Sequence, residues 1–441
     1  MKKKILLIGF LIIIAFFTIA LITNGKTVNR SSQITLNIWV MPNSENAEKD
    51  YQDLFKPFTK ANPNIKVVPN IIDWGSALIK IKAAALGASD APDLVEIGST
   101  WVAEVAETGG LTDLKKNFDF AKFLPGTLAS TGCVGKNEKT SIPWCTDTRM
   151  IIYRKDACQA AGVNPQKDFD NWDSFKNALK KLNQVEVNGK KLASFGTSGK
   201  ADDWDVVHNF AWWLWGAGGD YLSSEKKSMI NTSESFQGIK FFTNLAKDNL
   251  IDQKSLLLNS WEIQSGFARG DYAIIIAGGY TITGFEKQIK KNPHHILKDN
   301  FGVAIIPAGP KGRYAFFGSN NLSILKTSKN KAAALKLLNY MITNSAQIDL
   351  FKKTGLLPAI KSAYNDPYIS ENKIRKTFKA QFKYGRAYPS IPEWGTIENQ
   401  ILKSLSDMWI VLLKNKFENS DQLIKNELNK AASAINKIIQ E

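Results

Sequence analysis

The chain has 441 residues, with 44% hydrophobic and 22% charged side chains and a formal net charge of +16. This composition is that of a globular protein, and the length leaves room for two sizeable cores. Nucleic-acid binding is disfavoured, because only seven of the 57 basic residues are arginines and the lysines are spread along the chain. We therefore interpret the positive charge as a solvated lysine surface.

The N-terminus has the pattern of an export signal, which places the protein outside the cytoplasm. Three lysines within Met1 to Lys4 precede an uncharged apolar run from Ile5 to Ile22. The run is longer than the usual ~7 to 15 residues of a signal peptide and close to the minimum for a membrane span. Residues 1–25 are therefore either a cleaved signal peptide or a retained signal anchor. The mostly polar residues 26–33 are expected to form a short tether.

Strand and helix patterns alternate after the tether. The predicted elements are strand Ile34 to Trp39, helix Glu48 to Ala61, strand Ile65 to Pro69, helix Ser76 to Leu86, strand Asp93 to Ile97 and helix Val102 to Thr108. This order favours an open α/β sheet, in which ligand sites lie beyond the carboxyl ends of the strands.

The next stretch, from about Thr146 to Gly318, is richer in helix. Its predicted helices and strands are Trp172 to Leu182, Val206 to Trp215, Glu234 to Lys247 and Trp261 to Arg269, and Met150 to Tyr153 and Tyr272 to Ile276. A helical period returns from Lys331 to Phe351, and the C-terminus is predicted helical from Gln400 to the end. Because no low-complexity linker occurs, the two lobes should be joined by chain crossings.

Catalytic and metal-binding motifs are absent from the sequence. It has three histidines and no HExxH, GxSxG, P-loop, GxGxxG or CxxC pattern, so we expect no enzyme activity, metal or cofactor. A secreted carbohydrate-active hydrolase stays open as an alternative, because glycosidase carboxylates have no fixed local spacing. Cys133 and Cys145 could form a disulfide across a hairpin that turns near Lys136 to Lys139, leaving Cys158 unpaired.

Several short blocks occur in order between about residues 34 and 410. They are Asn37-Ile38-Trp39, Ala91-Pro92-Asp93-Leu94-Val95 with Gly98 and Trp101, Ile142-Pro143-Trp144 with Asp147-Thr148-Arg149 and Tyr153, Phe267-Ala268-Arg269-Gly270-Asp271-Tyr272-Ala273, Gly278-Gly279-Tyr280, Gly318-Ser319-Asn320-Asn321, and Gly355-Leu356-Leu357-Pro358. Together they make the chain resemble the extracellular solute-binding proteins of bacterial sugar ABC importers, the maltose-binding-protein-like group.

The resemblance implies a two-lobed α/β fold with a ligand cleft between lobes joined by several hinge crossings. The first lobe would comprise residues 34–145 and 320–357, and the second residues 146–319 and 358–441. Ligand binding would stabilise a closed form of the two lobes.

The implied function is capture of a sugar or oligosaccharide outside the cytoplasm. A monomer would deliver it to permease subunits served by a separate ATPase. A non-sugar solute such as a polyamine, metal or anion is an alternative ligand, and a receptor rather than a permease is an alternative partner.

The candidate site residues are aromatic platforms and paired polar groups, because a sugar presents apolar faces and a rim of hydroxyls. The aromatic candidates are Trp39, Trp74, Trp101, Trp144, Tyr280 and Trp394. By resemblance, Tyr280, after Gly279, and Trp394 would stack on the sugar, with Trp101 opposite them. The polar candidates are Asn43, Glu45, Asp73, Asp147, Arg149, Ser319 and Asn320.

Two segments have competing interpretations. Asp147 and Arg149 would point to the same side of an extended crossing, where they could grip vicinal hydroxyls or form a hinge salt bridge. Asp205 is interpreted as a helix N-cap. On the helix that follows, Trp204 and His208 share a face that could reach the ligand, although a structural histidine is an equal alternative.

Overall fold

The computed structural model describes residues 33–441. The predicted signal segment and all but the last residue of the predicted tether lie outside the described residues. Within 33–441, none of the helices is long and apolar enough to cross a membrane.

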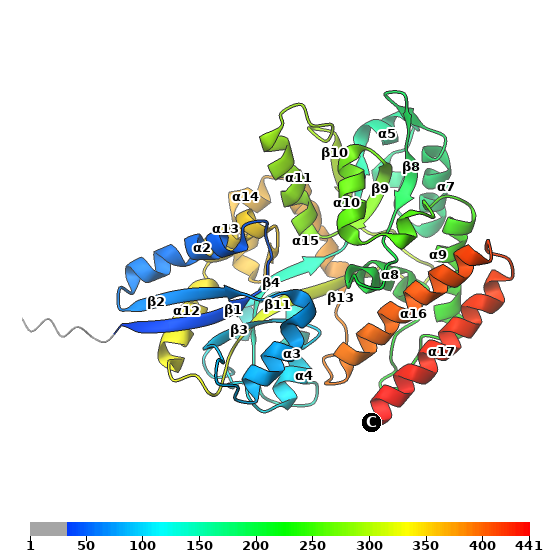
Figure 1. Cartoon of the computed structure of the whole chain (residues 1–441). Coiled ribbons are helices and arrows are strands. Elements are labelled where there is room, and N and C mark those ends of the chain that lie inside the picture. The colour runs from blue at the N-terminus through cyan, green and yellow to red at the C-terminus, as the bar shows by residue number, and fades with distance from the viewer. Residues whose placement is uncertain (1–32) are drawn as a thin grey trace, which may run out of the picture.

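The first lobe is built on a mixed sheet of seven strands. In spatial order these are β12 (Leu357–Pro358), β4 (Ile142–Thr148), β11 (Ala315–Ile324), β3 (Leu94–Gly98), β1 (Ile34–Val40) and β2 (Ile65–Ile71), with β13 (Gly385–Arg386) also paired to β11. Strands β2, β1 and β3 run parallel, whereas β11 is antiparallel to both β3 and β4. The carboxyl ends of β2, β1, β3 and β4 therefore meet at one edge of the sheet (Figure 1).

The second lobe is built on a four-stranded sheet. Its order is β10 (Phe301–Ala304), β5 (Met150–Arg154), β9 (Tyr272–Ala277) and β8 (Ala193–Gly196), and β6 (Glu186–Val187) pairs with β7 (Lys190–Lys191) outside it. Strand β9 is buried along its whole length, in agreement with its unbroken apolar sequence.

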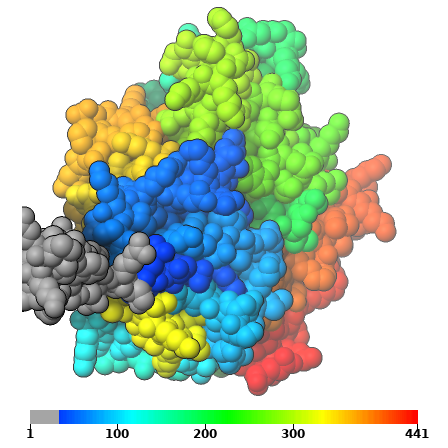
Figure 2. Space-filling view, turned by 60° about the vertical axis from the view of Figure 1, so that its left-hand side comes forward, coloured from blue at the N-terminus to red at the C-terminus, as the bar shows by residue number. Residues whose placement is uncertain are grey.

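Helices cover both sheets. The helices of the first lobe are α2 (Ala47–Ala61), α3 (Trp74–Ala85), α4 (Val102–Glu107), α12 (Lys331–Met341) and α13 (Asn344–Thr354). Those around the second sheet are α5 (Lys155–Ala160), α6 (Pro165–Asp168), α7 (Trp172–Leu182), α8 (Asp205–Gly216), α9 (Ser233–Lys247), α10 (Ser260–Arg269) and α11 (Gly279–Lys291). Segments remote in sequence lie side by side, because α12 contacts β1 (Figure 2).

The remaining elements follow β12 or connect the others. They are α14 (Pro367–Ser370), α15 (Lys373–Gln381), α16 (Trp394–Lys414), α17 (Ser420–Gln440), and the 3₁₀ helices η1 (Phe120–Lys122), η2 (Pro125–Ser130), η3 (Ser255–Leu257), η4 (Lys361–Asn365) and η5 (Phe382–Tyr384). Helices α16 and α17 form a pair against α8 and α9 of the second lobe (Figure 1).

Two predicted helices are each divided in the structure. The stretch predicted from Lys331 to Phe351 breaks between α12 and α13, where the Thr343 side chain accepts a hydrogen bond from Ala346 N and caps the second helix. The C-terminal stretch breaks between α16 and α17, where Lys416, Phe417 and Asn419 adopt positive φ. A continuous apolar period does not reveal such breaks, because both helices present apolar faces to the same core.

The chain passes between the sheets several times. The shortest crossing is a single residue, Arg149, because β4 ends at Thr148 in the first sheet and β5 begins at Met150 in the second. Strand β11 returns the chain to the first sheet, pairing with β4 from Phe317 onward. The predicted lobe boundary after residue 145 falls inside β4, three residues before that strand ends.

Candidate functional site

The crossing between β4 and β5 is surrounded by an ionic network. Arg149 donates one hydrogen bond to Asp147 Oδ2 and another to Asp205 Oδ1, and its side chain is only 2% exposed. Asp205 also accepts a hydrogen bond from the Tyr280 hydroxyl. Asp203, two residues before Asp205, accepts hydrogen bonds from the backbone N–H and hydroxyl of Ser260. We call Asp147, Arg149, Asp203, Asp205 and Tyr280 the hinge cluster.

The hinge cluster assembles side chains from three separate segments. Asp147 and Arg149 come from the crossing, Asp203 and Asp205 from the start of α8, and Tyr280 from the start of α11. Asp205 is not the N-cap expected from the sequence. It is the first residue of α8, and Asp203 Oδ1 accepts a hydrogen bond from its backbone N–H at 3.1 Å. The Asp205 carboxylate turns instead toward Arg149, a partner 56 residues away.

Burial and neighbouring charge shift several pKa values in this region. Burial opposes ionisation of Asp205, but Arg149 outweighs it and lowers the pKa of that carboxyl below its ordinary value. Burial and the Asp205 charge raise the pKa of Asp203 to about 6. Burial and the Arg149 charge lower the pKa of His208 to about 3, so this imidazole is neutral at pH 7.

The hinge cluster has unused hydrogen-bonding capacity. Among residues 33–441, buried Asp147 Oδ1 and Arg149 Nε have no hydrogen-bond partner. Buried polar atoms normally have partners, and unsatisfied ones are expensive unless something else satisfies them. An acceptor and a donor are therefore both unsatisfied close to the crossing, in side chains that are buried where the two lobes meet.

Aromatic side chains from both lobes meet near this cluster. Trp74 and Trp101 of the first lobe have ring centroids 5.5 Å apart. The Trp101 ring lies 6.4 Å from that of Trp204 in the second lobe. Trp74 and Trp204 remain partly exposed, whereas Trp101 is 4% exposed. The structure therefore brings three of the predicted aromatic candidates into one row across the two lobes.

His208 belongs to a second aromatic group in the second lobe. Its ring stacks on Phe316 with centroids 3.8 Å apart, and its Nδ1 lies 3.1 Å from the Tyr388 hydroxyl. Tyr388 in turn stacks on Trp394 at 4.8 Å. Trp394 is fully buried in this core. These contacts are those of a structural histidine within an aromatic cluster.

The first lobe has its own polar group at the ends of β1 and β3. Glu96 is fully buried, and its two oxygens accept hydrogen bonds from Met41 N at 2.7 Å, Asn43 Nδ2 at 2.8 Å and Asn320 Nδ2 at 2.6 Å. Burial raises the pKa of Glu96 to about 7. We call Asn43, Glu96 and Asn320 the strand-end cluster, in which each carboxylate oxygen has at least one partner.

The other predicted site residues have separate surroundings. Asp73 Oδ2 accepts a hydrogen bond from Gly75 N at 2.9 Å and caps α3. Glu45 is exposed and lies 3.4 Å from Lys291 Nζ. Ser319 Oγ donates to Asn321 Oδ1 at 2.9 Å. Trp144 is buried beside Tyr51, and Trp39 packs at the edge of the core that contains Trp101.

Gly279 allows the two lobes to approach closely beside Tyr280. A side-chain Cβ at this position would lie 2.7 Å from the backbone oxygen of Gly355, at the end of α13. A larger residue would therefore push the start of α11 away from the first lobe.

The expected disulfide is not present. Within the described residues Cys133, Cys145 and Cys158 are all free. Cys145 is buried in β4, whereas Cys133 lies in the loop after the 3₁₀ helix η2 and is partly exposed. The same residues contain no group of three or more side chains that could hold a metal ion.

Sequence reasoning missed Glu96, Asp203 and Glu398. Glu96 is an acidic residue inside the otherwise apolar strand Leu94–Gly98, and this exception was a usable signal. Glu398 lies buried on α16, where burial raises its pKa to about 8. Nothing in the local sequence distinguishes it from an exposed helical glutamate.

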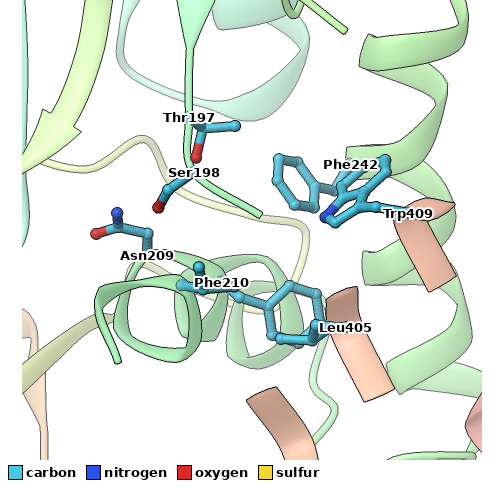
Figure 3. A pocket seen from close by; sticks show the side chains of 8 residues that line it. Thr197, Ser198, Asn209, Phe210, Phe242, Leu405 and Trp409 are labelled. Carbon is cyan, nitrogen blue, oxygen red and sulfur yellow. The ribbon is translucent and has the colours of Figure 1, made fainter. Parts of the chain in front are cut away.

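A mostly apolar pocket inside the second lobe is buried from solvent. It is lined by Thr197, Ser198, Val206, Asn209, Phe210, Phe242, Leu405 and Trp409 (Figure 3). The lining residues are each at most 4% exposed. A solute could enter only if α8, α9 and α16 separated, so we do not regard this pocket as the capture site.

Comparison with known proteins finds similarity to solute-binding proteins. The profile of a family described as "Bacterial extracellular solute-binding protein" matches residues 15–348. The diacetylchitobiose binding protein DasA of Streptomyces coelicolor is 24% identical over 411 residues, which cover 90% of this chain and 89% of DasA. The sn-glycerol-3-phosphate-binding periplasmic protein UgpB of Salmonella typhimurium is 22% identical over 334 residues, covering 72% of each chain.

Solved structures share the fold over nearly the whole chain. The GacH receptor of Streptomyces glaucescens, which was solved unliganded and with acarbose, is 25% identical with a TM-score of 0.75, covering 92% of this chain and 98% of GacH. Maltose-bound MalE3 of T. maritima is 23% identical with a TM-score of 0.76, and the match covers 90% of this chain and 99% of MalE3. The described chain is therefore similar to two-lobed solute-binding proteins along most of its length.

Proposed function

The chain belongs to the bacterial extracellular solute-binding proteins, and from this we propose that it captures a sugar or oligosaccharide outside the cytoplasm for an ABC importer. The observation that carries the proposal is the meeting of aromatic rings from both lobes, Trp101 and Trp204, beside the hinge cluster. Flat rings can stack on the apolar faces of a sugar, while the unpartnered Asp147 Oδ1 and Arg149 Nε can bind its hydroxyls.

The charge around the crossing argues against an anionic solute such as the phosphate ester named in UgpB. Two carboxylates, Asp147 and Asp205, contact the single guanidinium of Arg149, and a third, Asp203, lies near Asp205. Because that guanidinium already donates to two carboxylates, only its Nε is left for a phosphate. A neutral polyhydroxylated ligand suits this site better, because it adds no charge of its own.

A cationic solute such as a polyamine is the second candidate. It is favoured by the same excess of carboxylates, since an ammonium group is attracted by an uncompensated negative site. The carboxylates of Asp203 and Asp205 are, however, already hydrogen-bonded to Ser260, Tyr280 and Arg149. The aromatic row therefore gives the neutral sugar the stronger support.

Delivery requires partners that this chain does not supply. We infer that closure of the two lobes on the ligand presents a changed surface to permease subunits, with ATP hydrolysis provided by a separate subunit. The apolar run at residues 5–22 would either be cleaved or hold the protein at the outer face of the cytoplasmic membrane. The protein would act as a monomer without catalytic turnover.

A thermal-shift screen tests the proposal directly. Glucose, maltose, maltotriose, N-acetylglucosamine and diacetylchitobiose would be compared with spermidine and glycerol 3-phosphate. A ligand that binds only the folded state raises the melting temperature by mass action, with about 2.7 kcal/mol of stabilisation at a hundredfold excess over its Kd. We expect a rise with at least one sugar and no rise with glycerol 3-phosphate.

Two results would contradict the proposal. A shift with spermidine alone would favour the cationic solute. Release of smaller sugars from an oligosaccharide, followed by product analysis, would show an enzyme instead of a binding protein.

A further inference from the structure

Trp261 is an exposed tryptophan at a rigid position. Its side chain is 71% exposed, although it occupies the first turn of α10. The backbone there is fixed by a capping box, in which Asn259 Oδ1 accepts from Glu262 N at 3.0 Å and Glu262 Oε2 accepts from Asn259 N at 2.9 Å. The adjacent Ser260 is bonded to Asp203 of the hinge cluster. The backbone of Trp261 is therefore fixed, while its side chain is left exposed.

Trp261 lies next to Tyr280. Their ring centroids are 6.2 Å apart, and the ring planes are inclined by 49°. The Tyr280 hydroxyl is bonded to Asp205 and lies 3.4 Å from Gln264 Nε2 on the same helix as Trp261. Exposure rises along this line, from buried Arg149 through half-buried Tyr280 to exposed Trp261.

The exposed indole of Trp261 lies beside Tyr280, and covering its face with a ligand would gain the free energy of burial. A protein partner would normally need a contiguous apolar surface, whereas the residues on either side of Trp261 in the chain are the polar Ser260 and Glu262. A single flat ring with polar neighbours matches a sugar ring, which has an apolar face and a rim of hydroxyls. Consecutive rings of an oligosaccharide can lie on consecutive aromatic side chains.

We propose that Trp261 is an outer platform for a further sugar ring, so that the preferred solute is an oligosaccharide with one ring near Tyr280 and the next on Trp261. This inference rests on the proposed function. It adds a specificity-determining residue that favours longer ligands, because a second sugar ring would cover more of the exposed Trp261 face than a monosaccharide centred on Tyr280.

The test compares Trp261→Ala and Trp261→Phe with the wild-type chain. Isothermal titration calorimetry would be run with glucose, maltose and maltotriose, and with N-acetylglucosamine and diacetylchitobiose. For the series that the wild type binds, we expect Trp261→Ala to weaken the di- or trisaccharide about tenfold and the monosaccharide less than twofold. Trp261→Phe should restore most of the oligosaccharide affinity.

Ile79→Ala is the matched control, because Ile79 is 76% exposed on α3 of the other lobe and its truncation should leave every affinity unchanged. Equal affinities of wild type and Trp261→Ala for all lengths would overturn the inference, as would an equal loss for the monosaccharide. If the wild type itself bound none of these sugars, the proposed function would fail first, and this inference with it.

Discussion

The strand-end cluster and the hinge cluster contain similar polar side chains but differ in how completely those side chains are hydrogen-bonded. In the strand-end cluster, buried Glu96 accepts hydrogen bonds from donors that belong to its own lobe, so both of its oxygens have partners. In the hinge cluster, Asp147 Oδ1 and Arg149 Nε stay unpartnered among the described residues. A buried polar group that its own lobe satisfies is structural, whereas one with unused capacity is available to a ligand.

Replacement of Arg149 in the hinge cluster should have the largest effect. Arg149→Ala would leave Asp147 and Asp205 without their cation in a buried site, which typically lowers the free energy of unfolding by about 3–5 kcal/mol. Sugar affinity should fall as well. Arg269→Ala is the control, because the Arg269 side chain is 64% exposed and its pair with Asp271 should contribute below about 1 kcal/mol.

Urea unfolding and calorimetry measure the two effects separately. If Arg149→Ala kept wild-type affinity in a folded protein, the hinge cluster would be a structural salt bridge only, and the contrast with the strand-end cluster would disappear.

The strand-end cluster should make the stability of the protein depend on pH. The pKa of Glu96 is raised from an ordinary 4.5 to about 7, so between these values the folded protein binds more protons than the unfolded chain. This carboxyl therefore lowers stability as pH rises from about 4.5 to 7. Glu96→Gln removes that dependence. Between pH 5 and pH 8, the free energy of unfolding of the variant should therefore rise relative to that of the wild type by up to about 3 kcal/mol.

Urea unfolding of wild type, Glu96→Gln and the exposed control Glu45→Gln across this pH range measures the difference. Parallel pH curves for wild type and Glu96→Gln would show that Glu96 is ionised throughout. Sugar affinity at one pH should change little in Glu96→Gln, since Glu96 is satisfied within its own lobe.

The smallest expected effect concerns the approach of the lobes beside the hinge cluster. Gly279→Ala would place a Cβ 2.7 Å from Gly355 O, and such overpacking costs about 1–3 kcal/mol. Sugar affinity should fall several-fold, because the misfit lies between the lobes. Gly284→Ala, on the same helix with nothing within 4 Å of its added Cβ, should bind as the wild type does. Equal behaviour of the two variants would contradict a close contact at Gly279.

Much of the fold could be predicted from the sequence, because local patterns specify single elements. The helix Trp172–Leu182 was predicted from its apolar face with the observed bounds, and the structure adds a capping box of Asn171 and Ser174 at its start. Strand β9 and the helix before it were also predicted from their apolar patterns, and in the structure Gly270 ends α10 in the left-handed region with φ of 80°. The alternation of such elements indicated the α/β class.

The site depended on the sequence for its residue types and on the tertiary structure for their partners. The sequence by itself determined that Asp147 and Arg149 share a crossing and that Trp101 and Tyr280 follow strand ends. Only the fold decided that Asp205 binds Arg149, that Trp101 meets Trp204, and that Cys133 and Cys145 are free. Periodicity and capping act over a few residues, whereas these contacts join segments brought together by the crossings between the two sheets.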